Sequence, residues 1–535
     1  MHRHLARVAI VSALLALTAG PAVALPPPNQ SISLDLIGRY ETGIFDGSAA
    51  EIVAHDPETQ RLFVVNAAAA RIDVLAASDP TDPVALDPID VAAFGGFANS
   101  VDVDGGVVAI AVEAQVKTDP GTVVFTDADG TVLATAIVGA LPDMLTFTPD
   151  GKRVLVANEG EPNDDYSVDP EGSVSIIELS RRAGDLAVSE VRTVNFTDFN
   201  EGAPRHRELD PDIRIFGPGA SVAQDLEPEY IALSHDGRTA WVTLQENNAL
   251  AIIDVRTGTV SELVALGFKD HSLAGNGLDP SDRDGAIAIE TWPVLGMYMP
   301  DGIAAYRSRG QSYIITANEG DARDYAAYSE EARVEDLDLG PAIFSEGTAD
   351  EDQLGRLTVT TANGDTDGDG VFEELYAFGA RSFSIWSADG TLVFDSDDDF
   401  EQITADQLPD DFNANNDEND TFDNRSDNKG PEPEGVAVGE VRGRTFAFIG
   451  LERIGGVMVY DVTNPRAPSF VQYVNPRDFD GDVEAGTAGD LGPEGLTFIP
   501  AHQSPNGEPL LVVANEVSGS TAIYSVTAVG PGGGR

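Results

Sequence analysis

Apolar and polar residues alternate with a period of two along most of the chain, and helical periodicity is nearly absent. One unit recurs: an apolar strand, a turn such as Asp150-Gly151 or Asp236-Gly237, a β-branched strand, a polar stop and a further strand. The copies cover residues 50–77, 98–130, 142–180, 227–258, 300 onward, 431–465 and 493–526. The pattern therefore predicts an all-β protein built from repeats.

Seven antiparallel units of this length favour a seven-bladed β-propeller, in which radial repetition leaves few exposed strand edges. Six or eight blades are the alternatives. Two stacked β-sandwiches would also give short strands, but they would not place one motif at the same point of each repeat. We expect a single propeller domain over residues 25–527, followed by a disordered, glycine-rich tail over 528–535.

Long insertions separate the copies, at about residues 181–226, 259–299, 322–380, 396–430 and 472–491. They are rich in Asp, Asn, Gly and Pro, so we expect acidic loops that gather above one face of the disc. Loops of this length are usually functional or disordered.

The N-terminus has the pattern of an export signal. A basic start is followed by the apolar run Val8–Leu17 and by the small residues Ala22-Val23-Ala24. We expect a signal peptide over residues 1–24, with an amphipathic first helix as the alternative. The mature chain would be secreted or periplasmic, without a transmembrane anchor, because no second long apolar run follows.

Charge and composition exclude several functions. The 535-residue chain holds 90 Asp and Glu against 32 Lys and Arg, a formal net charge of −58. Such a field repels nucleic acid and anionic membranes and favours divalent cations. The chain has no cysteine, which excludes disulfides, thiolate zinc sites and cysteine nucleophiles. No G-x-S-x-G, H-E-x-x-H or Walker motif occurs either, so serine hydrolases and zincins lack support.

Acidic residues recur at two points of the repeat. An acid stands at the start of the innermost strand in five copies, and an amide–acid pair follows the second strand, as in Asn158-Glu159 and Asn318-Glu319. Both points border the central channel of a propeller, where several carboxylates would need a cation to relieve their repulsion. The candidate ligands are Asp143, Glu159, Glu229, Asp301, Glu319, Glu434 and Glu494. The alternative is that these acids cap strands within each blade.

A second acidic feature is the run NGDTDGDGVFEELY over residues 363–376. Asp365, Asp367 and Asp369 alternate as in an EF-hand calcium loop, and Glu374 is a candidate to complete the ligand shell. The run departs from that motif because its twelfth position is Tyr376. It predicts calcium binding, with an acidic solvated turn as the alternative.

Three cations stand near these acids in the sequence: Arg381, Arg425 and Lys429. They are candidate catalytic residues if they hold a phosphate whose other oxygens lie on a metal ion. In so acidic a chain they can equally well pair with carboxylates.

Several long runs resemble one family. They are LPDMLTFTPDGKRVLVANEGEPNDDYSVDPEGSVSII, YIITANEGDARDY, FGARSFSIW, FDSDDDFE, NRSDNKGPEPEGVAVG and GPEGLTFIP. The chain resembles the choice-of-anchor I family over about residues 32–526, and this family is similar to mesenchyme-specific cell-surface glycoproteins and to atypical alkaline phosphatases. The resemblance implies an extracellular β-propeller, with calcium binding in some relatives and phosphatase activity in others. This chain departs by showing no C-terminal sorting segment.

Two functions follow as expectations. The first is a metal-dependent phosphomonoesterase, in which Ca²⁺ and a second divalent or ferric ion in the central funnel bind phosphate esters. The second is a non-enzymatic calcium-binding protein that interacts with an extracellular polymer, a mineral or a protein. The fold alone does not decide between them.

Overall fold

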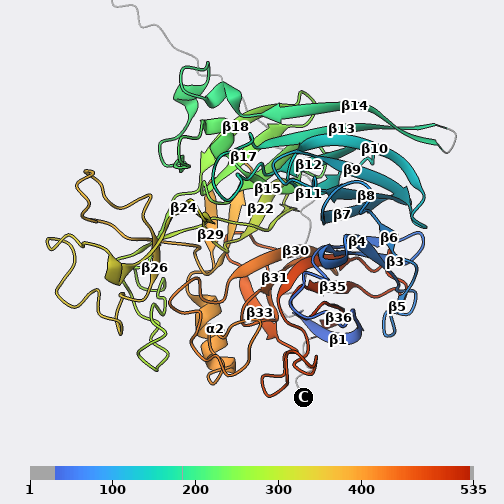
Figure 1. The fold of residues 1–535 in the computed structure, drawn as a ribbon. Coiled ribbons are helices and arrows are strands. Elements are labelled where there is room, and N and C mark those ends of the chain that lie inside the picture. Colours follow the sequence, from blue (N-terminus) through green and yellow to red (C-terminus); the bar gives the residue numbers. More distant parts are fainter. Residues whose placement is uncertain (1–30, 183–184, 531–535) are drawn as a thin grey trace, which may run out of the picture.

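The computed structural model describes residues 31–182 and 185–530, and these residues form a nearly all-β molecule (Figure 1). The predicted signal peptide over residues 1–24 lies outside the described residues, as do residues 531–535 of the predicted tail. None of the helices among the described residues is long and apolar enough to cross a bilayer.

Seven antiparallel sheets in the described part of the chain radiate from a common axis. The first sheet comprises β2 (Val53–Asp56), β3 (Arg61–Asn66), β4 (Arg71–Ala76), β5 (Val84–Ala85) and β6 (Ile89–Asp90). The second sheet comprises β7 (Ala98–Asp104), β8 (Val107–Val112), β9 (Pro120–Asp127) and β10 (Val132–Ala140). The third sheet comprises β11 (Pro142–Phe147), β12 (Arg153–Asn158), β13 (Ser173–Arg182) and β14 (Asp185–Asn195). The fourth sheet comprises β15 (Pro228–Leu233), β16 (Thr239–Leu244), β17 (Ala249–Asp254) and β18 (Thr259–Ala265). The fifth sheet comprises β21 (Ile303–Ser308), β22 (Gln311–Ala317), β28 (Phe383–Ser387) and β29 (Leu392–Asp395). The sixth sheet comprises β30 (Pro433–Val441), β31 (Arg444–Leu451), β32 (Val457–Asp461) and β33 (Ser469–Val474).

The last sheet joins the two ends of the described chain. It comprises β34 (Pro493–Ile499), β35 (Leu510–Asn515), β36 (Ser520–Val529) and the N-terminal strand β1 (Ser31–Glu41), with Ser31 opposite Val529. The innermost strands contact one another in a closed cycle, β2–β7–β11–β15–β21–β30–β34–β2. The prediction of an all-β propeller is therefore confirmed. The sheet runs to Val529, two residues past the predicted boundary at 527.

Adjacent sheets pack through the two faces of their central strands. All six residues of β8 are buried. Val108, Ile110 and Val112 pack toward the first sheet, whereas Val107, Ala109 and Ala111 pack toward the third. A strand that is buried on both faces must be apolar throughout, as this one is. Full burial of each valine or isoleucine contributes about 1.5–3 kcal/mol.

The insertions contain more regular structure than predicted. A five-stranded sheet of β19 (Phe268–Asp270), β20 (Leu295–Met297), β27 (Tyr376–Ala377), β26 (Thr358–Thr360) and β25 (Glu331–Arg333) has its own core, which includes Leu354, Leu357 and Val359. It projects from the disc (Figure 1). The insertions also contain the hairpin of β23 (Asp324–Tyr325) and β24 (Tyr328–Ser329) and the helices α1 (Val222–Asp225) and α2 (Asp399–Gln407). Short 3₁₀ turns cover Ala67–Ala69, Thr197–Phe199, His206–Glu208 and Val334–Asp336.

We predicted loops in places where the structure has outer strands. β14 and β18 lie within such segments, and the end of β33 lies at the edge of another. An outermost strand faces solvent on one side, so it carries polar residues at half of its positions. β14 is exposed or half-exposed along nearly its whole length. Its sequence therefore lacks the apolar signal on which the prediction depended.

Candidate metal centre

The axial acids lie where innermost strands begin. Asp143, Glu229, Glu434 and Glu494 each follow a proline that opens the strand, and the pairing register shifts directly after that proline. Proline is tolerated at the first residue of a strand, and such bulges re-aim side chains. The local sequence thus turns each carboxylate out of its own sheet.

Glycines let the strands approach closely at this point. Gly435 and Gly495 follow Glu434 and Glu494, and a Cβ atom on either would collide with the backbone carbonyl of the next axial acid around the ring, Glu494 and Glu51 respectively. The strand starts are therefore packed tightly around the axis, and their carboxylates are forced together.

The acids surround one cavity of about 240 Å³. All seven of the axial acids predicted from the sequence line it: Asp143, Glu159, Glu229, Asp301, Glu319, Glu434 and Glu494. Tyr230 lines both this cavity and a second one. Burial and the nearby acids raise the pKa of Tyr230, so its hydroxyl remains a donor.

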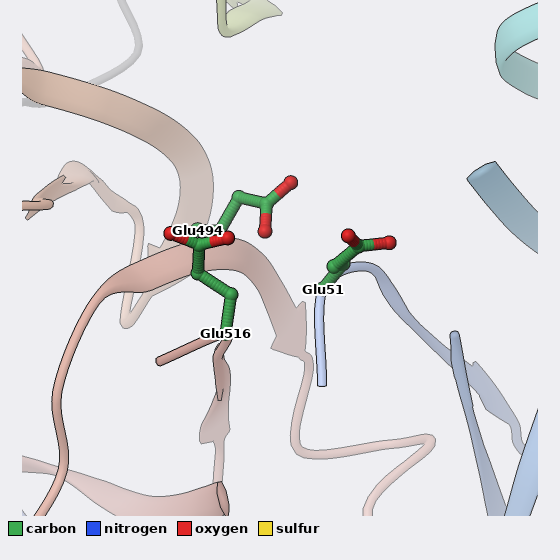
Figure 2. A group of neighbouring side chains, drawn as sticks. All are labelled: Glu51, Glu494 and Glu516. Carbon is green, nitrogen blue, oxygen red and sulfur yellow. The ribbon is translucent and has the colours of Figure 1, made fainter. Parts of the chain in front are cut away.

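Carboxylates within the funnel form groups of three. One oxygen each of Glu159, Glu229 and Glu246 lie within 4.8 Å of one another, and the same holds for Asp301, Glu319 and Glu434. A third group comprises Glu51, Glu494 and Glu516. Figure 2 shows these three carboxylates gathered from the two ends of the chain.

The environment opposes negative charge in these groups. Burial raises the pKa of Glu246 to about 8, and burial with neighbouring acids raises the pKa of Glu51 to about 8 and of Asp143 to about 7. Burial and mutual repulsion raise the pKa of Glu159 and Glu229 well above the usual range. Without a counter-charge the funnel therefore holds protons at neutral pH.

Four carboxylate oxygens in the funnel are buried and lack a hydrogen-bond partner among the described residues: Oε2 of Glu229, Glu246, Glu434 and Glu494. Glu229 and Glu246 are only 6% and 5% exposed. A buried acceptor without a partner costs about 1–3 kcal/mol, and more when it is charged. A proton or a cation would relieve this cost, and carboxylate oxygens are the donors that Ca²⁺ and Mg²⁺ prefer.

One side of the funnel already contains cations. Lys429 Nζ lies 2.9 Å from Glu319 and 3.3 Å from both Asp321 and Glu432. Arg425 and Arg453 also contact Glu432, at 2.6 and 2.8 Å. Although burial opposes ionisation, these three cations lower the pKa of Glu432.

On the other side burial is the larger effect: the charges of Arg323 near Glu246 and of Arg453 near Glu516 offset it only in part, and the pKa of both carboxyls is still raised. In the described ranges, no lysine or arginine forms an ion pair with Glu159, Glu229 or Glu246, or with the group of Glu51, Glu494 and Glu516. These two groups are therefore the places where a divalent cation fits best.

The structure does not bring the three predicted phosphate-binding cations together. Arg381 is buried, pairs with Glu401 at 2.7 Å and donates to the carbonyls of Asp279, Ser426 and Asn428. It joins the insertions to one another and does not line the funnel. Arg425 contacts Glu432, so only Lys429 of the three reaches a carboxylate of the cavity wall.

The EF-hand-like loop lies in the inserted segment, away from the residues that line the funnel. Asp365, Asp367 and Asp369 do gather, with one oxygen each within 4.8 Å of the others. Asp365, however, accepts hydrogen bonds from the backbone N–H groups of residues 368, 369 and 370. Glu374 accepts from the hydroxyl of Tyr376 and is not part of the group.

The sequence analysis missed several residues of the funnel. Glu51 stands in the first sheet at the point where the other axial acids follow a proline, but the residue before it is Ala50. Only the pairing register of β2 against β3 would have identified it as an axial acid. Glu432 and Arg453 carry no repeat signal. Glu246, Glu452 and Glu516 do follow the second strands of their blades, at the point where Glu159 and Glu319 were selected.

Two characterised proteins are similar in sequence. Gigasin-3a from Magallana gigas is 33% identical over 184 residues, which is 32% of this chain and 64% of that protein. A mesenchyme-specific cell surface glycoprotein from Strongylocentrotus purpuratus is 31% identical over 315 residues, which is 51% of this chain and 40% of that protein. In both, the match spans less than two thirds of the relative's length.

Solved structures with a similar course of the chain include the β-propeller domain of Myceliophteria thermophila Cps50 (Swd1) and the WD40 domain of Toxoplasma gondii coronin. The first is 9% identical with a TM-score of 0.42, covering 92% of this chain and 100% of that one. The second is 10% identical with a TM-score of 0.41, covering 94% and 87%. No argument about function follows from similarity at this level.

The family model of the choice-of-anchor I domain matches residues 51–465, from the axial acid Glu51 into the sixth sheet. This match includes most of the funnel and both of the insertions that flank β21 and β22, one before β21 and one between β22 and β28. The chain belongs to the choice-of-anchor I family.

Proposed function

We propose that the protein is an extracellular propeller that binds divalent cations, with Ca²⁺ the first candidate, in its axial funnel and has no hydrolytic activity there. The observation that carries the proposal is the group of Glu159, Glu229 and Glu246, in which Glu229 and Glu246 are buried and each has one carboxylate oxygen without a partner in the described part of the chain. The name of the sea-urchin relative, a cell surface glycoprotein, supports the extracellular setting.

The chemistry of the donors supports the choice of ion. Among the described residues, the funnel offers carboxylates from Asp and Glu and the amides of Asn99 and Gln245, its one sulfur is the thioether of Met144, and the predicted axial set has no imidazole. Hard oxygen donors suit Ca²⁺ and Mg²⁺ better than softer transition metals. A bound cation would supply the positive charge that Lys429, Arg425 and Arg453 supply on the other side.

Phosphomonoester hydrolysis by the same funnel has less support. It needs a cation that faces the transferring group, and the two predicted arginines are held by Glu401 and Glu432. Lys429 borders the funnel but contacts three carboxylates.

The test is calorimetric titration of Ca²⁺ into the metal-free chain, with Glu229→Gln as the variant and Glu262→Gln, an exposed acid of β18, as the matched control. We expect Glu229→Gln to weaken binding at least tenfold and the control to bind as wild type does. Unchanged binding in Glu229→Gln would refute the proposal. Metal-restored hydrolysis of p-nitrophenyl phosphate would refute the non-enzymatic part of it.

A further inference from the structure

A second concave site lies at the opposite end of the innermost strands. β15, β21 and β30 begin at the acidic funnel, and the turns in which they end enclose a cavity of about 700 Å³. This volume falls within the range of about 300–1,000 Å³ that small-molecule sites occupy. The funnel and this groove are therefore separate sites.

One arginine lines the groove, and two more lie close to lining residues in the sequence; none of the three has a carboxylate partner among the described residues. Arg307 lines it, and Arg309 and Arg442 are exposed in the turns that border it. In the portion of the chain that the structure describes, none of the three forms an ion pair, and Arg307 donates only to the carbonyl of Gly310, at 3.3 Å. Acids outnumber basic residues by 90 to 32 in this chain, so three such arginines in one place call for an anionic partner. Glu440 is the single acid that lines the groove among the residues with described positions.

Tyr306 gives independent evidence for a ligand here. Its side chain lines the groove and is 7% exposed, and its buried hydroxyl has no hydrogen-bond partner among the described residues. Burial raises its pKa, so the hydroxyl keeps its proton and can donate it in a hydrogen bond. A buried donor without a partner in a residue that lines a groove favours an acceptor in the groove, either a ligand oxygen or a water molecule.

The rest of the lining is mixed. Leu233, Ala305 and Val438 form an apolar surface, and Ser312 and Thr445 add hydroxyl groups. Flat sugar rings match an apolar surface flanked by hydroxyls, and guanidinium groups bind carboxylates in two-pronged fashion. The net charge of −58 repels polyanions of high charge density, such as nucleic acid, more strongly than a sparsely charged chain.

We propose that this groove binds an acidic polysaccharide with about one carboxylate per sugar unit. Arg307, Arg309 and Arg442 bind its carboxylates, and the hydroxyl of Tyr306 donates to a sugar oxygen. This site is independent of the axial cation and lies on the opposite face of the disc.

The test titrates the full mature chain at low ionic strength with a galacturonate hexamer, with neutral cellohexaose and with a hexaglutamate peptide. A chelator is present throughout, so that cations bridging to the funnel contribute nothing. We expect the galacturonate hexamer to bind, the neutral hexamer not to bind, hexaglutamate to bind more weakly, and the affinity to fall as salt is added.

Variants locate the binding. The double variant Arg307→Gln, Arg442→Gln is expected to lower the affinity at least tenfold, and Tyr306→Phe, which keeps the ring, several-fold. Arg207→Gln, an exposed arginine in another insertion, is the matched control and should bind as wild type does. Failure of the galacturonate hexamer to bind, equal binding of cellohexaose, tighter binding of hexaglutamate or unaltered binding by the double variant would each overturn the proposal.

Discussion

Replacing Glu246 with glutamine should stabilise the metal-free protein and reduce the stabilisation that Ca²⁺ provides. Glu246 is 5% exposed, and burial raises its pKa from 4.5 to about 8. Between these two values the folded state binds more protons than the unfolded state, so the free energy of unfolding of the metal-free protein falls as the pH rises. The slope from one such group is about 1.4 kcal/mol per pH unit.

The geometry gives a similar magnitude. If a second carboxylate of this group is also ionised, two unit charges 4.8 Å apart, the limit that contains the oxygens of Glu159, Glu229 and Glu246, repel by about 3.5 kcal/mol at an effective dielectric constant of 20. At pH 8 and without metal, Glu246→Gln should therefore be more stable than wild type by about 2–4 kcal/mol. With Ca²⁺ at about 100 times its Kd, wild type gains about 2.7 kcal/mol and the variant gains less.

The assay is urea denaturation at pH 5 and pH 8, in chelator and in excess Ca²⁺, for wild type, Glu246→Gln and the exposed control Glu262→Gln. The metal-free difference should be small at pH 5, where Glu246 is protonated, and large at pH 8. If the variant is destabilised at pH 8 in chelator, or if Ca²⁺ stabilises both proteins equally, the electrostatic reasoning is refuted.

Three further predictions concern the surrounding framework. Lys429→Met should destabilise the fold by about 3–5 kcal/mol, because Glu319 is left buried and uncompensated; urea denaturation measures this, and an unaffected midpoint would contradict it. Arg381→Met should loosen the insertions held through Glu401 without altering the affinity for Ca²⁺, which limited proteolysis and calorimetry would show; loss of cation binding would mean that Arg381 belongs to the site. Gly435→Ala should lower the melting temperature, since its Cβ has no room at the axis, and wild-type stability would refute the close approach of the strands.

The sequence predicted the propeller because its inner strands are short apolar runs bounded by turn residues, and this unit recurs along the chain. It also indicated the axial convergence, because Pro-acid pairs at equivalent points of a radial repeat must meet at the axis. Outer strands such as β14 were missed because one side of each faces solvent and carries polar residues.

Pairing between distant segments could not be predicted in this way. The contacts of Lys429 with Glu319 and of Arg381 with Glu401 depend on the path of long insertions, which no local pattern encodes. Two of the three candidate phosphate-binding cations, Arg381 and Arg425, are therefore engaged elsewhere. Glu51 shows a milder limit: the position is equivalent, but the proline that marks the other sites is absent.

The most direct test of the central claim is a crystal structure of the protein grown with Mn²⁺, which substitutes for Ca²⁺ at oxygen sites, with anomalous differences recorded. We predict an anomalous peak within the axial cavity, bound by carboxylates of Glu159, Glu229 and Glu246. The claim would be contradicted if the crystals showed Mn²⁺ only at the exposed loop of Asp365, Asp367 and Asp369 and no anomalous peak in the axial cavity.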